Sequence, residues 1–332
     1  MKLRNKKISE FVKYQNSKKK LFTPGPGSLL EENIYGLQPC FGRGDLSYDK
    51  IENEVLKKIK LISGHKKITR VQGSASFALE IMIQNFIFGN ILIIKTGTYS
   101  DRLFQMCVSA KKSIKKINKI EYVEWKNIKK QNKKRYSWIL CCYVETSIGF
   151  KLPIEDLYKL KMNYKSKLAL DATASIGLEE NHQLADVIGF SSCKGLLGLT
   201  GAGFISYNKD PNNIVQSFNF NIQNHINKKM TGPYHSICSL YYVLNIHNQF
   251  RYSIKINKKL FLKKMKKYLI YDYKNQPNLC TLISKKINNK NKKIVLYKSR
   301  ADISGSVVCH LGEAHLKQKA RGKILKYLSQ NN

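Results

Sequence analysis

Between residues 68 and 207, short and mainly apolar runs alternate with segments long enough for a helix. Continuous apolar runs are typical of strands buried on both faces, and their alternation with helices is typical of a parallel sheet covered by helices. We therefore predict an α/β fold with a mostly parallel, seven-stranded sheet. The predicted strands are ITRVQ, ILIIK, KIEYVEW, WILCCYV, KLALD, VIGFS and AGFISY.

The pattern becomes mainly helical after residue 235. A chain of 332 residues is long enough for one large domain and a smaller one. We predict an N-terminal arm at 1–20, a large domain at 21–235 and a small α+β C-terminal domain at 236–332.

The net charge of +37 is unusual, but only eight of the 59 basic residues are Arg, the preferred reader of base edges. The chain has no helix-turn-helix, zinc-finger or RNP signature, so we predict no specific nucleic-acid partner. The excess of Lys, Asn and Ile favours compositional drift, although the charge should still cause salt-sensitive binding to polyanions.

The eight cysteines have no CxxC spacing, and residues 1–20 contain no apolar signal-peptide core. No run approaches the roughly 18 apolar residues that a membrane helix needs. We therefore expect a cytoplasmic protein with reduced thiols, without a membrane partner or a metal site.

Polar residues follow several predicted strands, where open α/β sheets bind their ligands. Lys194 follows VIGFS, and burial there would make its amine nucleophilic, unless the side chain only extends to solvent. Asp171 ends KLALD; a buried carboxylate needs a cation or several donors, and capping of the next helix is the simpler alternative.

Ser74 and Ser76 follow ITRVQ, where a small-residue turn into a helix either binds a phosphate or is only a turn. Tyr99 follows ILIIK and either stacks on a planar ligand or packs in the core. Together, a phosphate cradle, an aromatic ring, an acid and a buried lysine are what pyridoxal 5'-phosphate requires, so we predict that cofactor.

The order of these motifs resembles that of the class V, fold-type I aminotransferases, most closely the 2-aminoethylphosphonate–pyruvate transaminases. The matching segments cover most of the chain. They are LFTPGPGSLLEEN, QGSASFALE, TGTYSDR, YVETSIGFKLPIEDL, LALDATASIG, DVIGFSSCKGLLGLTGAGF, TGPYHS and LGEAH.

The resemblance implies that the cofactor phosphate is held by Ser74, Ala75 and Ser76, with a further contact from Ser192. In this family the threonine of TGPYHS reaches the phosphate of the neighbouring subunit. Thr231 therefore implies a homodimer with shared active sites.

The resemblance also implies that Tyr99 stacks on the pyridine ring, Thr146 binds near its phenolic oxygen and Asp171 pairs with its nitrogen. Lys194 forms the internal aldimine and then acts as the base that moves the proton. The expected reaction is a ping-pong transfer of an amino group from a small amine or amino acid to pyruvate or a similar oxo acid.

One position departs from the family pattern. Relatives carry an arginine that binds the substrate's anion shortly before the segment matched by LGEAH, and here that position is Val307. Arg43, Arg300 and His310 are candidate replacements, and the TPGP turn at 23–26 is expected at the substrate end. The sequence therefore does not determine the identity of the amino donor.

Three other functions stay open. The first is an aminotransferase of the serine–pyruvate or alanine–glyoxylate kind. The second is a cysteine desulfurase with Cys309 as its reactive thiol, and the third is a non-catalytic scaffold with the same fold. The presence of both Asp171 and Lys194 argues against the scaffold, because a decaying site would not retain both.

Overall fold

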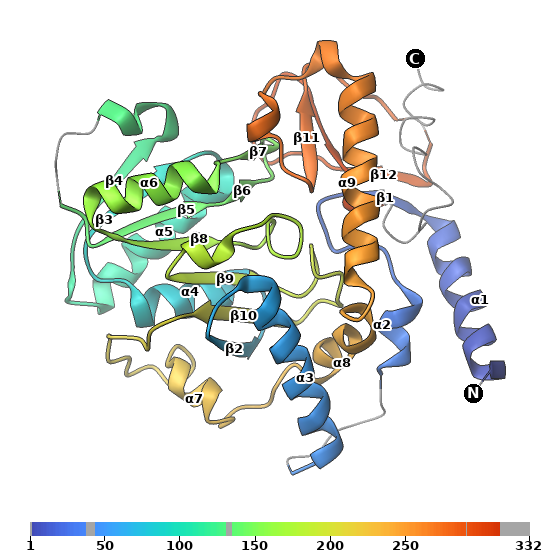
Figure 1. Cartoon of the computed structure of the whole chain (residues 1–332), viewed down its shortest axis with the longest axis horizontal. Helices are drawn as coiled ribbons and strands as arrows, with labels where there is room; N and C mark the ends of the chain where they lie inside the picture. Colours follow the sequence, from blue (N-terminus) through green and yellow to red (C-terminus); the bar gives the residue numbers. More distant parts are fainter. Residues whose placement is uncertain (1, 38–43, 131–134, 290, 313–332) are drawn as a thin grey trace.

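The computed structural model describes residues 2–37, 44–130, 135–289 and 291–312. Its centre is a seven-stranded sheet in the order β2-β10-β9-β8-β5-β3-β4 (Figure 1). Strand β10 is antiparallel to both neighbours, and the other adjacent pairs are parallel. The strands are β2 (Lys67–Gln72), β3 (Gly89–Lys95), β4 (Ile117–Glu124), β5 (Trp138–Cys142), β8 (Lys167–Asp171), β9 (Val187–Ser191) and β10 (Ala202–Tyr207).

Helices cover both faces of this sheet, as its continuous apolar strands require. On one face, α4 (Ala75–Phe86) and α5 (Thr98–Ser113) pack against the strands, together with Ile222 of the short helix α7 (Ile222–Ile226). The opposite face is covered by α3 (Leu46–Ser63), α6 (Ile154–Tyr164) and α8 (Tyr234–Val243). The predicted α/β fold with a mostly parallel, seven-stranded sheet is confirmed.

The remaining described elements lie beside the large sheet (Figure 1). Strand β1 (Lys20–Phe22) pairs in parallel with β12 (Ile294–Leu296), and β11 (Cys280–Ile283) pairs with β13 (Ser306–Cys309) in antiparallel fashion. The predicted boundary at 235/236 falls inside α8, and the division into domains stays a prediction. The elements are α1 (Lys2–Lys18), β1 (Lys20–Phe22), α2 (Glu31–Tyr35), β6 (Val144–Glu145), β7 (Phe150–Lys151), α9 (His247–Lys264), β11 (Cys280–Ile283), β12 (Ile294–Leu296) and β13 (Ser306–Cys309).

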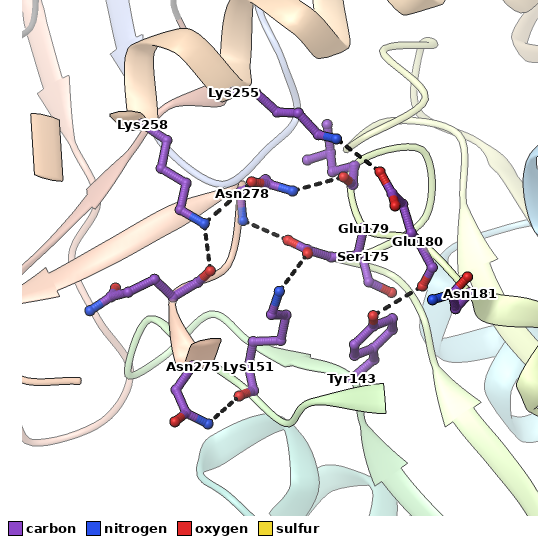
Figure 2. A network of polar contacts seen from close by, with 12 residues as sticks. Tyr143, Lys151, Ser175, Glu179, Glu180, Asn181, Lys255, Lys258, Asn275 and Asn278 are labelled. Carbon is purple, nitrogen blue, oxygen red and sulfur yellow. Dashed lines mark hydrogen bonds and ion pairs between the residues drawn. The ribbon is translucent and has the colours of Figure 1, made fainter. Parts of the chain in front are cut away.

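A polar network joins α9 and the β11 segment to the sheet (Figure 2). The buried Glu179 carboxylate accepts hydrogen bonds from Lys151 Nζ at 2.9 Å and from the backbone N–H of Asn278 at 2.6 Å. Lys258 of α9 donates to the Gln276 carbonyl at 2.6 Å, and burial lowers its pKa to about 8. These bonds fix the C-terminal segment against the loop that follows Asp171.

No helix in the described part of the chain is long and apolar enough to cross a membrane.

Candidate functional site

A cavity of about 500 Å³ lies at the carboxyl ends of the parallel strands, which is where α/β sheets bind ligands. Its volume lies within the range of small-molecule sites. The cavity brings together most of the predicted site residues, although they come from five separate segments. Those that line it are Ser74, Ala75, Ser76, Tyr99, Thr146, Asp171 and Lys194.

The anion-binding end of the cavity is the start of α4. Ser74 caps this helix, because its side chain accepts a hydrogen bond from the backbone N–H of Phe77 at 3.3 Å. The preceding Gly73 has φ of +153° and donates to the Gly201 carbonyl at 2.9 Å. The first N–H groups of a helix have no intrahelical acceptor. Those at the start of α4 can therefore bind an anion in the cavity.

Lys194 follows β9 and lies against the turn at 23–26. A Cβ atom on Gly25 would stand 2.8 Å from Lys194 Cγ, and Gly27 donates to the Cys193 carbonyl at 3.2 Å. Gly25 and Pro26 also line the cavity. The Nζ atom of Lys194 lies 5.4 Å from the centroid of the Tyr99 ring. The amine and the aromatic ring therefore face the same space.

Asp171 ends β8 and is 9% exposed. One carboxylate oxygen accepts from the backbone N–H of Thr173 at 2.9 Å, and the other lies 3.6 Å from Cys142 Sγ. A turn rather than a helix follows, so Asp171 caps a turn. It forms no ion pair within the described part of the chain. A buried carboxylate with this little compensation can bind a cationic group in the cavity.

Two buried hydroxyls at the cavity wall lack partners. The Oγ1 atoms of Thr146 and Thr173 form no hydrogen bond with any described residue, and both threonines line the cavity. An unsatisfied buried hydroxyl is costly, so these atoms mark positions where a ligand's polar atoms bind. With the α4 cradle, the Tyr99 ring and the Lys194 amine, they fit a flat, phosphorylated aldehyde such as pyridoxal 5'-phosphate.

Sequence reasoning missed Arg102. It lies three residues after Tyr99 on α5, lines the cavity and places its guanidinium 5.0 Å from the centroid of the Tyr99 ring. One guanidinium nitrogen donates to Ser76 Oγ at 3.2 Å. The helical spacing within TGTYSDR could have indicated this proximity, because residues three apart share a helix face.

Sequence reasoning also missed the buried Glu145. Its carboxylate accepts hydrogen bonds from the backbone N–H groups of Tyr99 and Ser100, each at 3.1 Å, and from the Ser147 hydroxyl. Burial raises the pKa of Glu145, while these hydrogen bonds act in the opposite direction. Glu145 therefore fixes the start of α5 and the backbone of Tyr99.

Two predicted phosphate contacts lie elsewhere. Ser192 is buried and its hydroxyl donates to the Leu199 carbonyl, so it does not line the cavity, whereas its neighbour Ser191 does. Thr231 is exposed and does not line the cavity of its own subunit. Its predicted contact with a neighbouring subunit stays a prediction.

Of the candidate anion contacts, the structure places one at the cavity. Arg300 lines the cavity, whereas Arg43 lies outside the described residues, as does the LGEAH segment after residue 312. His310 is buried and does not line the cavity; its Nε2 lies 3.0 Å from Thr281 Oγ1, and burial lowers its pKa to about 3. Cys309 is also buried outside the cavity lining, which disfavours a desulfurase.

The chain belongs to the aminotransferase class-V family, whose model matches residues 48–228. This range includes the cavity residues predicted to bind the cofactor, from Ser74 to Lys194. Membership of the family implies pyridoxal 5'-phosphate as the cofactor and confirms that prediction.

Curated relatives are similar at low identity. A bifunctional phosphonoacetaldehyde hydrolase/aminoethylphosphonate transaminase from Clostridioides difficile is 26% identical over 68% of this chain and 39% of its own length. A 2-aminoethylphosphonate–pyruvate transaminase from Bacillus cereus is 29% identical over 57% of this chain and 59% of its own length. The chain thus spans about half the length of the curated relatives it matches.

Solved structures with the same fold cover nearly the whole chain. An aspartate aminotransferase from Thermus thermophilus matches with a TM-score of 0.78 at 14% identity, over 94% of this chain and 99% of its own. An alanine–glyoxylate aminotransferase from Nostoc sp. matches with a TM-score of 0.78 at 16% identity, over 94% and 95% of the two chains. At these identities the likeness establishes the fold-type I architecture alone.

Proposed function

We propose that this class V aminotransferase transfers the amino group of 2-aminoethylphosphonate, or of a closely related small amine, to pyruvate. The observation that supports it is the convergence of the Lys194 amine, the Tyr99 ring and the Asp171 carboxylate on one cavity that begins at an anion-binding helix start. The names of the curated relatives support the choice of donor and acceptor.

Each cavity residue has a distinct role in this proposal. The start of α4 and Arg102 hold the phosphate of the cofactor, Tyr99 supports its ring, and Asp171 keeps its ring nitrogen protonated. The cofactor supplies an electron sink for the carbon bonded to the amino group.

Lys194 is the proton carrier, because within the described part of the chain it is the only lysine that lines the cavity. Its free Nζ would remove the proton from the carbon that bears the donor's amino group and return it to the cofactor's aldehyde carbon, on the other side of the amino nitrogen. The wall formed by Leu79, Leu103 and Met106 excludes water from this transfer.

The functional unit in this proposal is a homodimer. Thr231 is exposed on a segment that does not line its own cavity, as a contact with a partner subunit's cofactor phosphate requires. Sedimentation of the purified protein should give the mass of a dimer, and Thr231→Ala should weaken cofactor binding. A stable monomer with a full complement of cofactor would contradict this part of the proposal.

A spectroscopic screen of amino donors tests the function. The purified protein should be yellow, with an absorbance band that borohydride removes, and 2-aminoethylphosphonate should bleach the band until pyruvate restores it. Bleaching by serine or alanine alone would favour the serine–pyruvate or alanine–glyoxylate kind of enzyme. Sulfide release from cysteine would indicate a desulfurase, and a colourless protein that ignores added cofactor would indicate a scaffold.

A further inference from the structure

The cavity carries an excess of positive charge. Three cations line it, namely Lys194, Arg102 and Arg300, whereas Asp171 is the only carboxylate among the described lining residues. The cofactor's aldehyde and phosphate account for Lys194 and Arg102 in the proposed function, on which this inference rests. One cation, Arg300, is left for another anion.

Arg300 differs from Arg102 in its surroundings. Arg102 donates to Ser76 and lies over the Tyr99 ring, which places it beside the helix start that binds the phosphate. Arg300 is exposed and makes no hydrogen bond or ion pair with any residue in the described part of the chain. Its guanidinium therefore has its full set of donors available to a ligand that enters from solvent.

The surroundings of Val307 beside the cavity are apolar. Val307 of β13 is buried and belongs to the same hydrophobic cluster as Val144 and Ala174, which both line the cavity. The strand that contains Val307 thus supplies no cation to the cavity, and any cation for a substrate must come from another segment.

The loop that contains Arg300 is fixed to the cofactor end of the cavity. The neighbouring Ser299 donates its hydroxyl hydrogen to the Ser147 carbonyl and accepts from the N–H of Ala301 at 2.9 Å. The Ser147 hydroxyl in turn donates to Glu145, whose carboxylate holds the backbone of Tyr99. A continuous chain of hydrogen bonds therefore positions the Arg300 loop relative to the Tyr99 ring.

We propose that Arg300 binds the anionic group of the amino donor, a phosphonate or carboxylate, and so replaces a cation that β13 does not provide. A guanidinium can hold such a group with two parallel hydrogen bonds, which fixes its orientation as well as its charge. The donor's amine is then directed toward Lys194, which lines the same cavity.

The test compares donors with and without the anion in four proteins. Wild type, Arg300→Gln, Arg300→Lys and the control Lys298→Gln are mixed with 2-aminoethylphosphonate or with n-butylamine, and bleaching of the cofactor band is followed. Lys298 is exposed on the same loop and does not line the cavity. Lys298→Gln therefore removes one positive charge, as Arg300→Gln does, without changing the cavity lining.

We expect Arg300→Gln to raise the half-saturating concentration of 2-aminoethylphosphonate by about 10- to 100-fold, the usual effect of losing a charged hydrogen bond. The half-saturating concentration of Arg300→Lys should lie between those of wild type and Arg300→Gln, because lysine keeps the charge but loses the paired geometry. The response to n-butylamine should change by less than about threefold. Lys298→Gln should match wild type for both donors.

An equal response of Arg300→Gln and wild type to the anionic donor would overturn the inference, as would an equal loss for both donors. Calorimetric binding of ethylphosphonate, which has no amine to transfer, gives a second measure that needs no turnover. Ethylphosphonate should bind to the wild-type protein, and its affinity for Arg300→Gln should be at least tenfold lower. Absence of bleaching by any amine would refute the proposed function, whereas ethylphosphonate binding that ignores position 300 would refute only the role of Arg300.

Discussion

The Nζ atom of Lys194 lies 5.4 Å from the centroid of the Tyr99 ring, across the cavity that receives the cofactor. Lys194 follows β9, and Tyr99 lies in the first turn of α5, which follows β3; β9 and β3 are not adjacent in the sheet. The pair faces the same space because parallel strands end at the same edge. The proposed catalytic arrangement is thus a product of the topology, and it can be tested one side chain at a time.

Replacing Lys194 with alanine should abolish the borohydride-sensitive absorbance band. It should also lower transamination by about 10²- to 10⁴-fold or more, because no other described lysine lines the cavity. Absorbance spectra and single-turnover rates measure both effects. Lys209→Ala, an exposed lysine just after β10, should behave as wild type. Retention of the band in Lys194→Ala would place the attachment site elsewhere.

Replacing Asp171 with asparagine removes the charge that would hold the cofactor's ring nitrogen protonated, while it keeps the acceptor for the Thr173 N–H. Loss of one partner from a buried charge pair costs about 3–5 kcal/mol, so the rate should fall by about 10²- to 10⁴-fold. The cofactor should remain bound through its phosphate and Lys194. Transamination rates at saturating donor measure this loss. The control is Asp210→Asn, because Asp210 is an exposed carboxylate. A variant as fast as wild type would mean that Asp171 does not face the ring.

Arg102→Gln should weaken binding of pyridoxal 5'-phosphate more than binding of pyridoxal, which lacks the phosphate. We expect about a 10- to 100-fold loss for the phosphorylated ligand and less than about threefold for pyridoxal. Dissociation constants from absorbance titrations of wild type and variant measure the loss of affinity for each ligand. Arg251→Gln, whose arginine pairs with Glu180 outside the cavity, is the matched control. Equal losses for both ligands would mean that Arg102 supports Tyr99 rather than the phosphate.

Lys258 should make the protein more stable as the pH rises above 8. Burial lowers the pKa of Lys258 to about 8 in the folded chain, against an ordinary value of 10.5. Between these values the unfolded chain binds a proton that the folded chain does not, so a higher pH favours folding. Relative to Lys258→Met, wild type should gain about 2 kcal/mol of unfolding free energy between pH 8 and pH 9.5.

Urea denaturation at the two pH values measures this difference. The control is Lys255→Met, one turn earlier on the same helix, where the lysine is 40% exposed and pairs with Glu180. That variant should follow the wild-type pH dependence. If wild type and Lys258→Met changed in parallel, Lys258 would be protonated throughout and fully compensated by its hydrogen bonds.

The sequence was sufficient to predict the large sheet, because most of its seven strands are apolar runs bounded by polar segments. Each predicted run overlaps a strand of the sheet, from β2 to β10. The cavity residues could be predicted for the same reason. Ser74, Tyr99, Asp171 and Lys194 follow strands whose direction is fixed by the parallel order, so their convergence needs no further information.

What the sequence did not predict depends on side-chain direction and on distant pairing. Ser191 and Ser192 are neighbours, yet only Ser191 lines the cavity, and a local pattern does not show which of the two points inward. The role of Glu145 depends on N–H groups more than forty residues away. Arg300 is one of three candidate anion contacts in the sequence, and only the fold shows that it lines the cavity whereas His310 does not.

The pairing of β1 with β12 has a consequence for how the protein is made. Lys20, Leu21 and Phe22 leave the ribosome long before their partners Ile294, Val295 and Leu296. Contacts between such distant segments form slowly. The seven-stranded sheet, complete at Tyr207, can fold first, and β1 pairs with β12 in a separate two-stranded sheet only once β12 has emerged.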